Sequence, residues 1–346
     1  MLVEAVAFFL AVSILFYCLF AGADFGAGIL EAFLGRHHRE QQRTVIAHAI
    51  GPVWEANHVW LILAVVILFM GFPKAYSALS ITFHVPLTLM LVGIILRGCA
   101  FTFRHYDAVR DGSQRAYSAI FVISSFLTPV MLGVVAGGML LGDTHPVEAG
   151  FYAAFIQPWT HLFCFSVGAF TCVLFAFLAA VYLLGETHNP EVRRLFVRRA
   201  MILNIIAIIA GVAVFIAAEI DGLELARLFA ARALSLASMG GATLILVPLW
   251  IAIRQNSFQL ARVLVAGQVG LVLIGWFRLQ FPVIINAHAH PLTIYAAAAP
   301  EATLRYLLYA LLAGSAIIFP AFIYLLKVFK MSETTPITDT IETRQR

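Results

Sequence analysis

The chain changes from polar to strongly apolar within Ile50-Gly51-Pro52-Val53-Trp54-Glu55-Ala56-Asn57-His58-Val59-Trp60-Leu61, and the apolar run continues to Met70. A helix that begins near Pro52 is allowed, because proline is tolerated in a first helical turn. Such a helix would carry a carboxylate, an amide, an imidazole and two indoles into a bilayer. An ionisable group at that depth is costly, so it is a candidate for function with a partner elsewhere in the chain.

The composition indicates a membrane protein. Of 346 residues, 62% are hydrophobic and 12% are charged, and the mean hydropathy is +0.94. These values exclude a soluble domain with a polar surface and predict an all-α polytopic membrane protein. The net charge of +4 indicates no nucleic-acid partner, because basic residues of membrane proteins usually lie in loops on one side of the bilayer.

About nine spans are expected if each crossing takes about 20 apolar residues. They lie near residues 3–23, 50–70, 77–100, 117–140, 158–184, 200–220, 236–253, 260–280 and 305–327. The seventh is short and broken, with Pro248 inside it. Residues 1–330 then form one membrane domain, and the polar tail 331–346 is expected to be disordered.

Basic residues predict the orientation. Most arginines fall in the loops after spans one, three, five and seven, and the tail adds further basic residues. By the positive-inside rule the N-terminus lies outside and the C-terminus in the cytoplasm. The segment 279–304, rich in proline and alanine, is expected to fold on the outer surface.

Asp24 lies between two glycines at the end of the first span. Gly22 and Gly26 form a small-xxx-small face on which another helix can approach closely, which brings Asp24 near a neighbouring backbone. Two interpretations are open. Asp24 carries protons, or it caps a helix at the interface.

The second span carries two polar pairs at helical spacing. Glu55 and His58 share one face, and Trp54 and Asn57 share another. A glutamate in a partly hydrated, low-dielectric site can take up and release protons. The alternative is an interfacial belt formed by Trp54 and Trp60, with polar groups at headgroup depth.

Arg97 lies near the cytoplasmic end of the third span. It is the natural counter-ion for a buried carboxylate, because it stays protonated and binds in a bidentate way. The alternative is that it extends to the headgroups from a helix end.

Histidines raise a haem hypothesis, since imidazoles from two helices can ligate iron. His58, His84 and His161 lie in or beside spans, but no local motif marks a pair, and the cysteines show no CxxC or CxxCH spacing. We therefore expect no haem or metal site on this chain.

Several stretches of the chain resemble those of a known family, subunit II of cytochrome bd-type quinol oxidases. The resemblance rests on 24–28 (Asp-Phe-Gly-Ala-Gly), 51–61 and Arg97, and on Phe281-Pro282, Leu292-Thr293 and Ala298-Ala299-Pro300 before the last span. It covers most of the chain and is most specific in the N-terminal third.

The resemblance implies two four-helix bundles plus one peripheral helix, in a bacterial cytoplasmic (inner) membrane. It implies a partner, subunit I, that carries haems b and d and the quinol site, so this subunit is not catalytic alone. The complex oxidises quinol and reduces dioxygen to water. The resemblance leaves open a small single-helix accessory subunit and a structural quinone or lipid on this chain.

The resemblance also implies a proton path from the cytoplasm, to which Asp24 and Glu55 correspond, with Arg97 at a matching interior position. The chain departs from the family where members often have acidic residues, at Ala21 and Thr102, and has Glu55 in place of an aspartate. We therefore expect the path to use His58, which stands where members have glutamine or glutamate.

Two other functions are considered. A proton-coupled secondary transporter would also place ionisable groups in the membrane, but no second copy of the Asp24 or Trp54 segment is found. A self-sufficient membrane cytochrome would ligate haem through the histidines named above.

Overall fold

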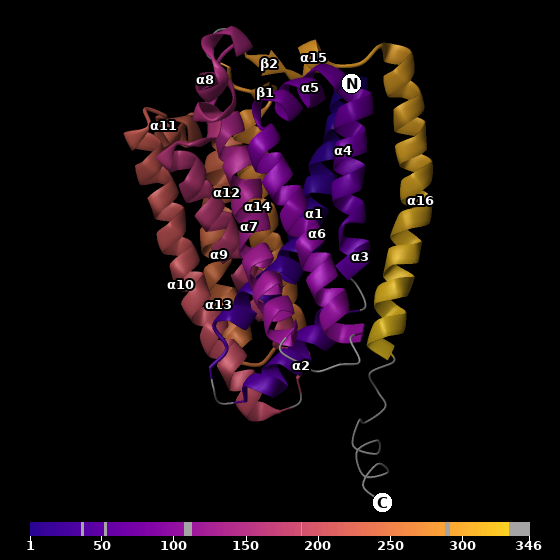
Figure 1. Cartoon of the computed structure of the whole chain (residues 1–346), viewed down its shortest axis with the longest axis vertical. Coiled ribbons are helices and arrows are strands. Elements are labelled where there is room, and N and C mark those ends of the chain that lie inside the picture. The colour runs from indigo at the N-terminus through magenta and orange to yellow at the C-terminus, as the bar shows by residue number, and fades with distance from the viewer. Residues whose placement is uncertain (36–37, 52–53, 107–112, 188, 288–290, 332–346) are drawn as a thin grey trace, which may run out of the picture.

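A computed structural model describes residues 1–35, 38–51, 54–106, 113–187, 189–287 and 291–331. Long helices lie side by side between two ends of the molecule (Figure 1). One end carries the N-terminus, a two-stranded sheet and several short helices, and is called the sheet end here. The other carries α2 and is called the α2 end.

The long helices of the described residues are α1 Leu2–Ala32, α4 Val59–Gly71, α6 His84–Tyr106, α7 Ser113–Leu141, α9 Leu162–Leu183, α10 Pro190–Ile220, α12 Ala233–Leu244 continued by α13 Leu246–Arg254, α14 Phe258–Gln280 and α16 Glu301–Met331. The shorter elements are α2 Arg39–Ile50, α3 Trp54–Asn57, α5 Pro73–Thr82, η1 Val147–Ala149, α8 Phe151–Phe155, η2 Gln157–Trp159, α11 Leu225–Ala230, β1 Val283–Ile285, β2 Leu292–Thr293 and α15 Ile294–Ala297.

The long helices form two groups of four. α1, α4, α6 and α7 pack together, α9, α10, α12–α13 and α14 form the second group, and α16 lies against α1 and α4. Among the described residues eight helices are long and apolar enough to cross a membrane, and the bent pair 55–71 and 73–82 makes a ninth. The expectation of an all-α membrane protein with about nine spans, two bundles and one peripheral helix is confirmed.

The expected third span, 77–100, was wrong at its start. Residues 73–82 form a separate helix, α5, bent by 116° from the preceding helix, and α6 begins only at His84. The bend occurs at Phe72, and Pro73 at the first position of α5 cannot donate a backbone hydrogen bond. α5 therefore lies across the sheet end instead of continuing into the bilayer (Figure 1).

Two other boundaries differ from expectation. The first helix does not end near Ala23 but runs to Ala32, so Asp24 lies inside it and does not cap it. The seventh span is broken at Ile245. Pro248 has no N–H to donate to the carbonyl four residues earlier, which explains a break at this point.

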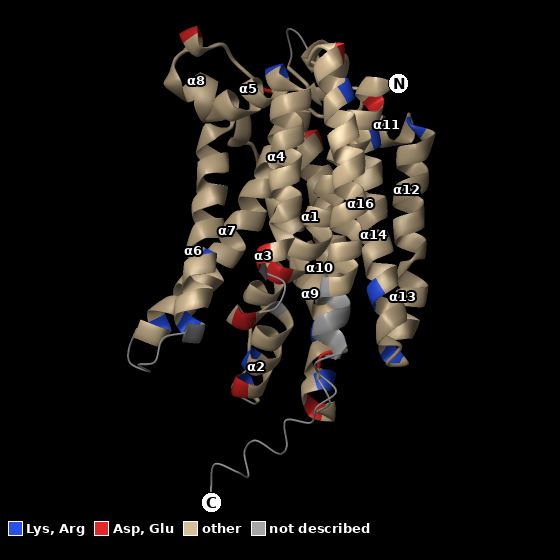
Figure 2. Ribbon diagram, turned by 90° about the vertical axis from the view of Figure 1, so that its right-hand side faces the viewer, with Lys and Arg blue, Asp and Glu red and all other residues tan. Residues whose placement is uncertain are grey.

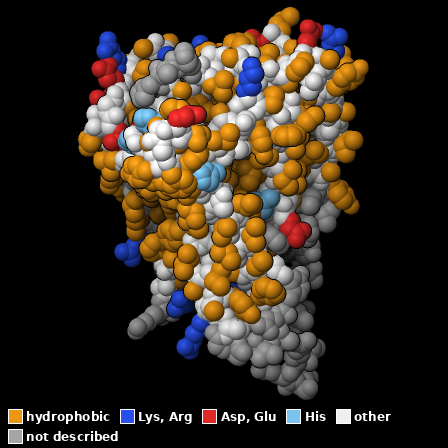
Figure 3. All heavy atoms as spheres, turned by 45° about the horizontal axis from the view of Figure 1, so that its top comes forward, with side chains coloured by type: hydrophobic (Ala, Val, Ile, Leu, Met, Phe, Trp, Pro, Cys, Tyr) orange, Lys and Arg blue, Asp and Glu red, His pale blue; other side chains and the backbone are white. Residues whose placement is uncertain are grey.

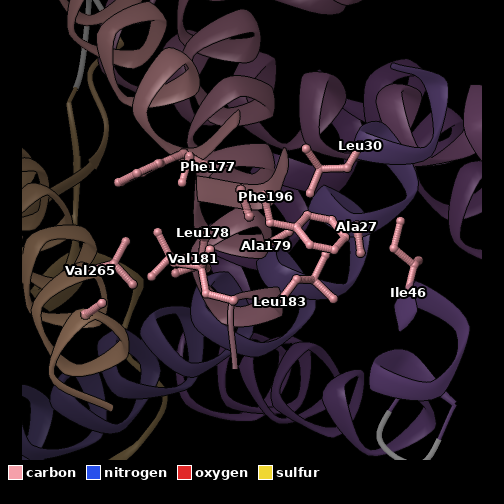
Figure 4. Close-up of a cluster of buried hydrophobic side chains, with 14 of the residues drawn as sticks. Ala27, Leu30, Ile46, Phe177, Leu178, Ala179, Val181, Leu183, Phe196 and Val265 are labelled. Atoms are coloured by element: carbon pink, nitrogen blue, oxygen red, sulfur yellow. The ribbon is translucent and has the colours of Figure 1, made fainter. Parts of the chain in front are cut away.

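The core forms where α9 contacts both groups of helices. α9 packs against α1, α7, α10 and α14, so its near-continuous apolar sequence is buried on most sides. Phe177, Leu178 and Val181 meet Leu30 of α1 and Phe196 of α10 in the largest buried cluster (Figure 4).

The described residues of the segment 281–299 fold at the sheet end and include no spanning helix, and their position on the outer surface of the membrane stays a prediction. β1 and β2 pair antiparallel, the Asn286 amide donates to the Met139 carbonyl, and the Ala299 amide donates to the Gly71 carbonyl. These bonds attach the segment to α7 and α4. The tail after Met331, which was predicted to be disordered, lies outside the described part of the chain.

Apolar side chains cover much of the flank of the molecule (Figure 3). Charged residues gather near the two ends of the helices (Figure 2). This distribution is the one expected for a protein surrounded by lipid.

Candidate functional site

The site begins with a close crossing of α1 and α9. A Cβ placed on Gly26 would lie 1.9 Å from the Phe175 carbonyl oxygen, and one on Gly22 would lie 2.8 Å from the Phe175 ring. Gly28 faces α7 in the same way, because a Cβ there would lie 2.1 Å from Ser125 Oγ. The glycines therefore allow α1 to lie close to two neighbouring helices and fix the height of Asp24 between them.

Asp24 and Arg97 form a bidentate ion pair inside the bundle. Arg97 Nη1 donates to Asp24 Oδ2 at 2.8 Å, and Nη2 donates to Oδ1 at 2.7 Å. Nη2 also donates to the Asp24 backbone carbonyl at 2.8 Å. The side chains are only 2% and 1% exposed, so Arg97 does not extend to the headgroups.

Three further side chains complete the surroundings of Arg97. Its Nε donates to Ser125 Oγ at 3.2 Å. The rings of Phe25 and Phe121 each have their centroid 4.9 Å from the Arg97 Cζ. Aromatic faces attract a guanidinium, most strongly where water is excluded. Arg97 is therefore held by the carboxylate, a hydroxyl and two rings together.

A second buried carboxylate lies closer to the α2 end. Glu31 of α1 is 2% exposed and accepts from Arg43 Nε at 2.8 Å. Arg104 Nη1 donates to both Glu31 oxygens at 2.8 and 2.9 Å. The Arg104 Cζ lies 4.5 Å from the Phe121 ring centroid, so Phe121 contacts the arginines of both ion pairs.

The two ion pairs follow one helical register. Asp24 and Glu31 are seven residues apart on α1, and Arg97 and Arg104 are seven residues apart on α6. Seven residues make two turns, about 10 Å along a helix, and α1 and α6 run in the same direction (Figure 1). Glu31 and Arg104 were not predicted as site residues from the sequence, although their matched spacing was a signal for them.

His58 lies beside the Asp24–Arg97 pair. Its ring centroid is 6.2 Å from that of Tyr17 and 6.0 Å from that of Phe25, and the Phe25 ring also contacts Arg97. Tyr17 Oη and His58 Nδ1 are buried and make no hydrogen bond with a described residue. Two groups able to exchange protons therefore lie next to the ion pair.

Glu55 does not join this buried group. It lies on the short helix α3, is exposed in this chain, and is linked to His58 by the His58 amide, which donates to the Glu55 carbonyl at 3.2 Å. Asn57 is buried, whereas the side chain of Trp54 lies outside the described residues. The helix expected to continue through this stretch is interrupted at His58, between α3 and α4.

Trp60 is not part of an interfacial belt. It is 3% exposed and packs against Phe16 of α1 at 4.6 Å and against Phe319 and Phe322 of α16 at 5.8 and 5.9 Å between ring centroids. Such aromatic pairs add to the energy of apolar burial. Trp60 therefore joins the peripheral helix to the first bundle.

A third polar group lies at the sheet end. Asp143 accepts from His161 Nε2 at 2.8 Å and from Gln157 Nε2 at 3.0 Å, and His145 Nε2 is 3.0 Å from its other oxygen. Partial burial raises the pKa of the Asp143 carboxyl, but the hydrogen bonds from Gln157 and His161 and the nearby charges of His145 and His161 together outweigh it and leave this pKa below its usual value.

The histidines considered as haem ligands lie in separate places. His161 contacts Asp143 at the sheet end, His84 Nδ1 contacts the Ile81 carbonyl at 2.9 Å, and His58 lies in the interior beside α1. Within the described ranges no group of three or more His, Cys, Asp or Glu side chains could hold a metal ion.

Comparison with known proteins gives consistent matches. Cytochrome bd ubiquinol oxidase subunit 2 of Bacillus subtilis (strain 168) is 33% identical over 147 residues, 41% of this chain and 41% of the relative. Cytochrome bd-I ubiquinol oxidase subunit 2 of Escherichia coli (strain K12) is 35% identical over 127 residues, 37% of this chain and 33% of the relative. The aligned segments span less than half of each relative.

The fold also matches a solved structure, that of bd oxidase from Geobacillus thermodenitrificans. The TM-score is 0.75 with 21% sequence identity, over 95% of this chain and 99% of the other. This likeness shows the shared fold. A family model described as cytochrome bd terminal oxidase subunit II matches residues 2–329.

The family match extends through every spanning helix of the described chain. Together with these apolar helices it identifies an integral protein of the inner membrane. The chain belongs to the family of cytochrome bd terminal oxidase subunit II.

Proposed function

We propose that this chain is the non-haem-bearing subunit of a bd-type terminal quinol oxidase. Its partner would be a haem-bearing subunit I, which would hold haems b and d, oxidise quinol and reduce dioxygen to water. The single observation that carries the proposal is the family match over residues 2–329. In this proposal the chain itself performs no redox step.

The proposed orientation places the α2 end in the cytoplasm. Arg39, Arg115 and Arg194 lie at the α2 end, as do most of the other described basic residues, and far fewer lie at the sheet end. The positive-inside rule then puts the N-terminus outside and the C-terminus in the cytoplasm.

We further propose that the chain conducts protons toward the partner. Reduction of dioxygen to water consumes one proton for each electron, so the reaction needs a route from the cytoplasm. The proposed route enters at the exposed Glu55, passes the half-buried His58 and reaches Asp24, whose charge is balanced by Arg97. Because these side chains make no direct hydrogen bond along this line among the described contacts, transfer would pass through intervening water.

The geometry of the ion pair favours a second role for Asp24. Both of its carboxylate oxygens accept from Arg97, and the pair is almost completely buried. An ion pair of this kind is an anchor between α1 and α6, since loss of one partner leaves an uncompensated buried charge. Under this second candidate only Glu55 and His58 would exchange protons.

Membranes of a strain that lacks only this chain test the proposal. We expect quinol-dependent oxygen consumption by the bd oxidase to disappear and to return when the wild-type chain is supplied. Unchanged oxygen consumption and haem content without the chain would contradict its role as an oxidase subunit.

A further inference from the structure

We propose that the groove between α10 and α13 binds the headgroup and one acyl chain of an anionic phospholipid. The groove has a volume of about 860 Å³ and is lined by residues from the start of α10 and the end of α13. This inference is independent of the proposed role in the oxidase, because it rests only on the shape and charge of this surface.

The polar part of the groove carries four arginines, Arg193, Arg194, Arg198 and Arg254. Arg194, Arg198 and Arg254 are exposed, and no carboxylate of the described residues forms an ion pair with any of the four. The guanidinium fork matches the geometry of a phosphate. The cluster is therefore complementary to an anionic headgroup.

Local structure holds this cluster in place. Asn189 caps the start of α10 by accepting from the amides of Glu191 and Val192, which fixes the first turns of the helix. Arg193 Nη2 donates to the Thr187 carbonyl at 2.6 Å. The Arg193 Cζ lies 4.9 Å from the Phe258 ring centroid, which further restrains this side chain.

The groove continues from the arginines along an apolar wall. Ile202 and Ile205 line it and are 45% and 46% exposed. They lie one to two turns beyond Arg198, deeper along the spanning helix. Trp250 forms the opposite wall, and its Nε1 donates to Asn204 Oδ1 at 2.8 Å, which fixes the indole plane.

This arrangement selects the ligand. A soluble anion would gain no binding energy from exposed isoleucines inside the bilayer. An uncharged quinone would gain no ion pair from four arginines. Basic pockets between spanning helices at the membrane surface suit anionic lipid headgroups. The combination therefore fits an anionic phospholipid, with phosphate at the arginines and an acyl chain along Ile202 and Ile205.

The test uses the protein purified from its native membrane with its accompanying subunits, after lipid has been removed with detergent. Phosphatidylglycerol, or phosphatidylcholine with the same acyl chains, is added in nanodiscs, and the thermal midpoint and bound lipid are measured. We expect phosphatidylglycerol to bind and raise the midpoint, and phosphatidylcholine to do so much less.

The variant R194Q/R198Q should require about tenfold more phosphatidylglycerol for the same effect, because each basic residue near a membrane surface strengthens anionic lipid binding. The matched control R39Q/R115Q removes two exposed arginines from the same end of the molecule and should respond as wild type. A second variant, I205W, narrows the apolar part, keeps all four arginines, and should also bind less lipid.

Three outcomes would overturn the proposal. Equal effects of the two lipids would indicate an apolar groove without headgroup recognition. The same midpoint rise with inorganic phosphate alone would indicate a free-anion site. A wild-type response of both R194Q/R198Q and I205W would show that lipid acts elsewhere on the protein.

Discussion

Arg97 of α6 donates one hydrogen bond to each carboxylate oxygen of Asp24 of α1, at 2.8 and 2.7 Å. Both side chains are buried. This pair joins two helices that are separated by 73 positions in the chain. Its burial determines how substitutions at either residue should behave.

The D24N variant should assemble poorly. The amide leaves the Arg97 guanidinium buried without a counter-charge, which costs about 3–5 kcal/mol. Thermal midpoint and yield of the purified complex measure this loss. The double variant D24N/R97Q removes both charges and should recover much of the stability. If D24N assembles like wild type and only turnover falls, Asp24 carries protons and does not act as an anchor.

The E55Q variant should leave stability nearly unchanged, because exposed substitutions usually alter it by less than about 0.5 kcal/mol. If Glu55 is the proton entrance, oxygen consumption should fall by about tenfold or more, since the amide cannot transfer the proton. E40Q, at another exposed glutamate of the α2 end, is the control. Equal oxygen consumption by E55Q and E40Q would remove Glu55 from the path.

The G26A variant should separate α1 from α9. The added methyl group would lie 1.9 Å from the Phe175 carbonyl oxygen. This oxygen belongs to the backbone of α9, which cannot move aside as a flexible side chain can. We expect a loss of about 1–3 kcal/mol or more, measured as a lower thermal midpoint. In G240A the added Cβ meets nothing within 4 Å, so this control should keep the wild-type midpoint.

The Asp143 group should make the sheet end sensitive to acid. Because the pKa of Asp143 is lowered in the folded protein, its stabilisation is present above its usual pKa and is lost as pH falls through the folded value. The protection factors of amide hydrogen exchange at residues 143–161, corrected for the intrinsic dependence of exchange on pH, should therefore decrease between pH 5 and pH 3, by an amount that reflects about 1 kcal/mol or less. D143N should exchange faster at pH 5 and change less with acid; identical profiles would exclude Asp143 as the cause.

Sequence predicted the number of spans because each crossing needs a long apolar run, which this chain shows clearly. It did not predict α5, because Phe72 to Phe83 is apolar enough to continue either helix and only the local geometry at Phe72 and Pro73 decides the bend. Helix ends beyond the apolar run were also missed, as at Ala32, since polar residues there are buried by ion pairs.

The site was also predicted only in part from the sequence. Asp24 was recognised at the end of the first span and Arg97 as a counter-ion for a buried carboxylate, and the structure adds that these two residues form the pair. Glu31 and Arg104 lay outside the expected spans and were missed, although each lies seven residues after its counterpart in the first ion pair and the two bind each other. Whether Glu55 faces the interior depends on the break at His58, which the apolar periodicity of the stretch did not reveal.

Purification of the tagged chain from its native membrane, followed by a reduced-minus-oxidised spectrum and identification of the accompanying proteins, tests the central claim most directly. The account predicts that a second polytopic subunit with b- and d-type haem bands co-purifies, and that the chain expressed alone shows no haem spectrum. A chain that purifies alone and colourless from its native membrane, or alone with bound haem, would contradict the account.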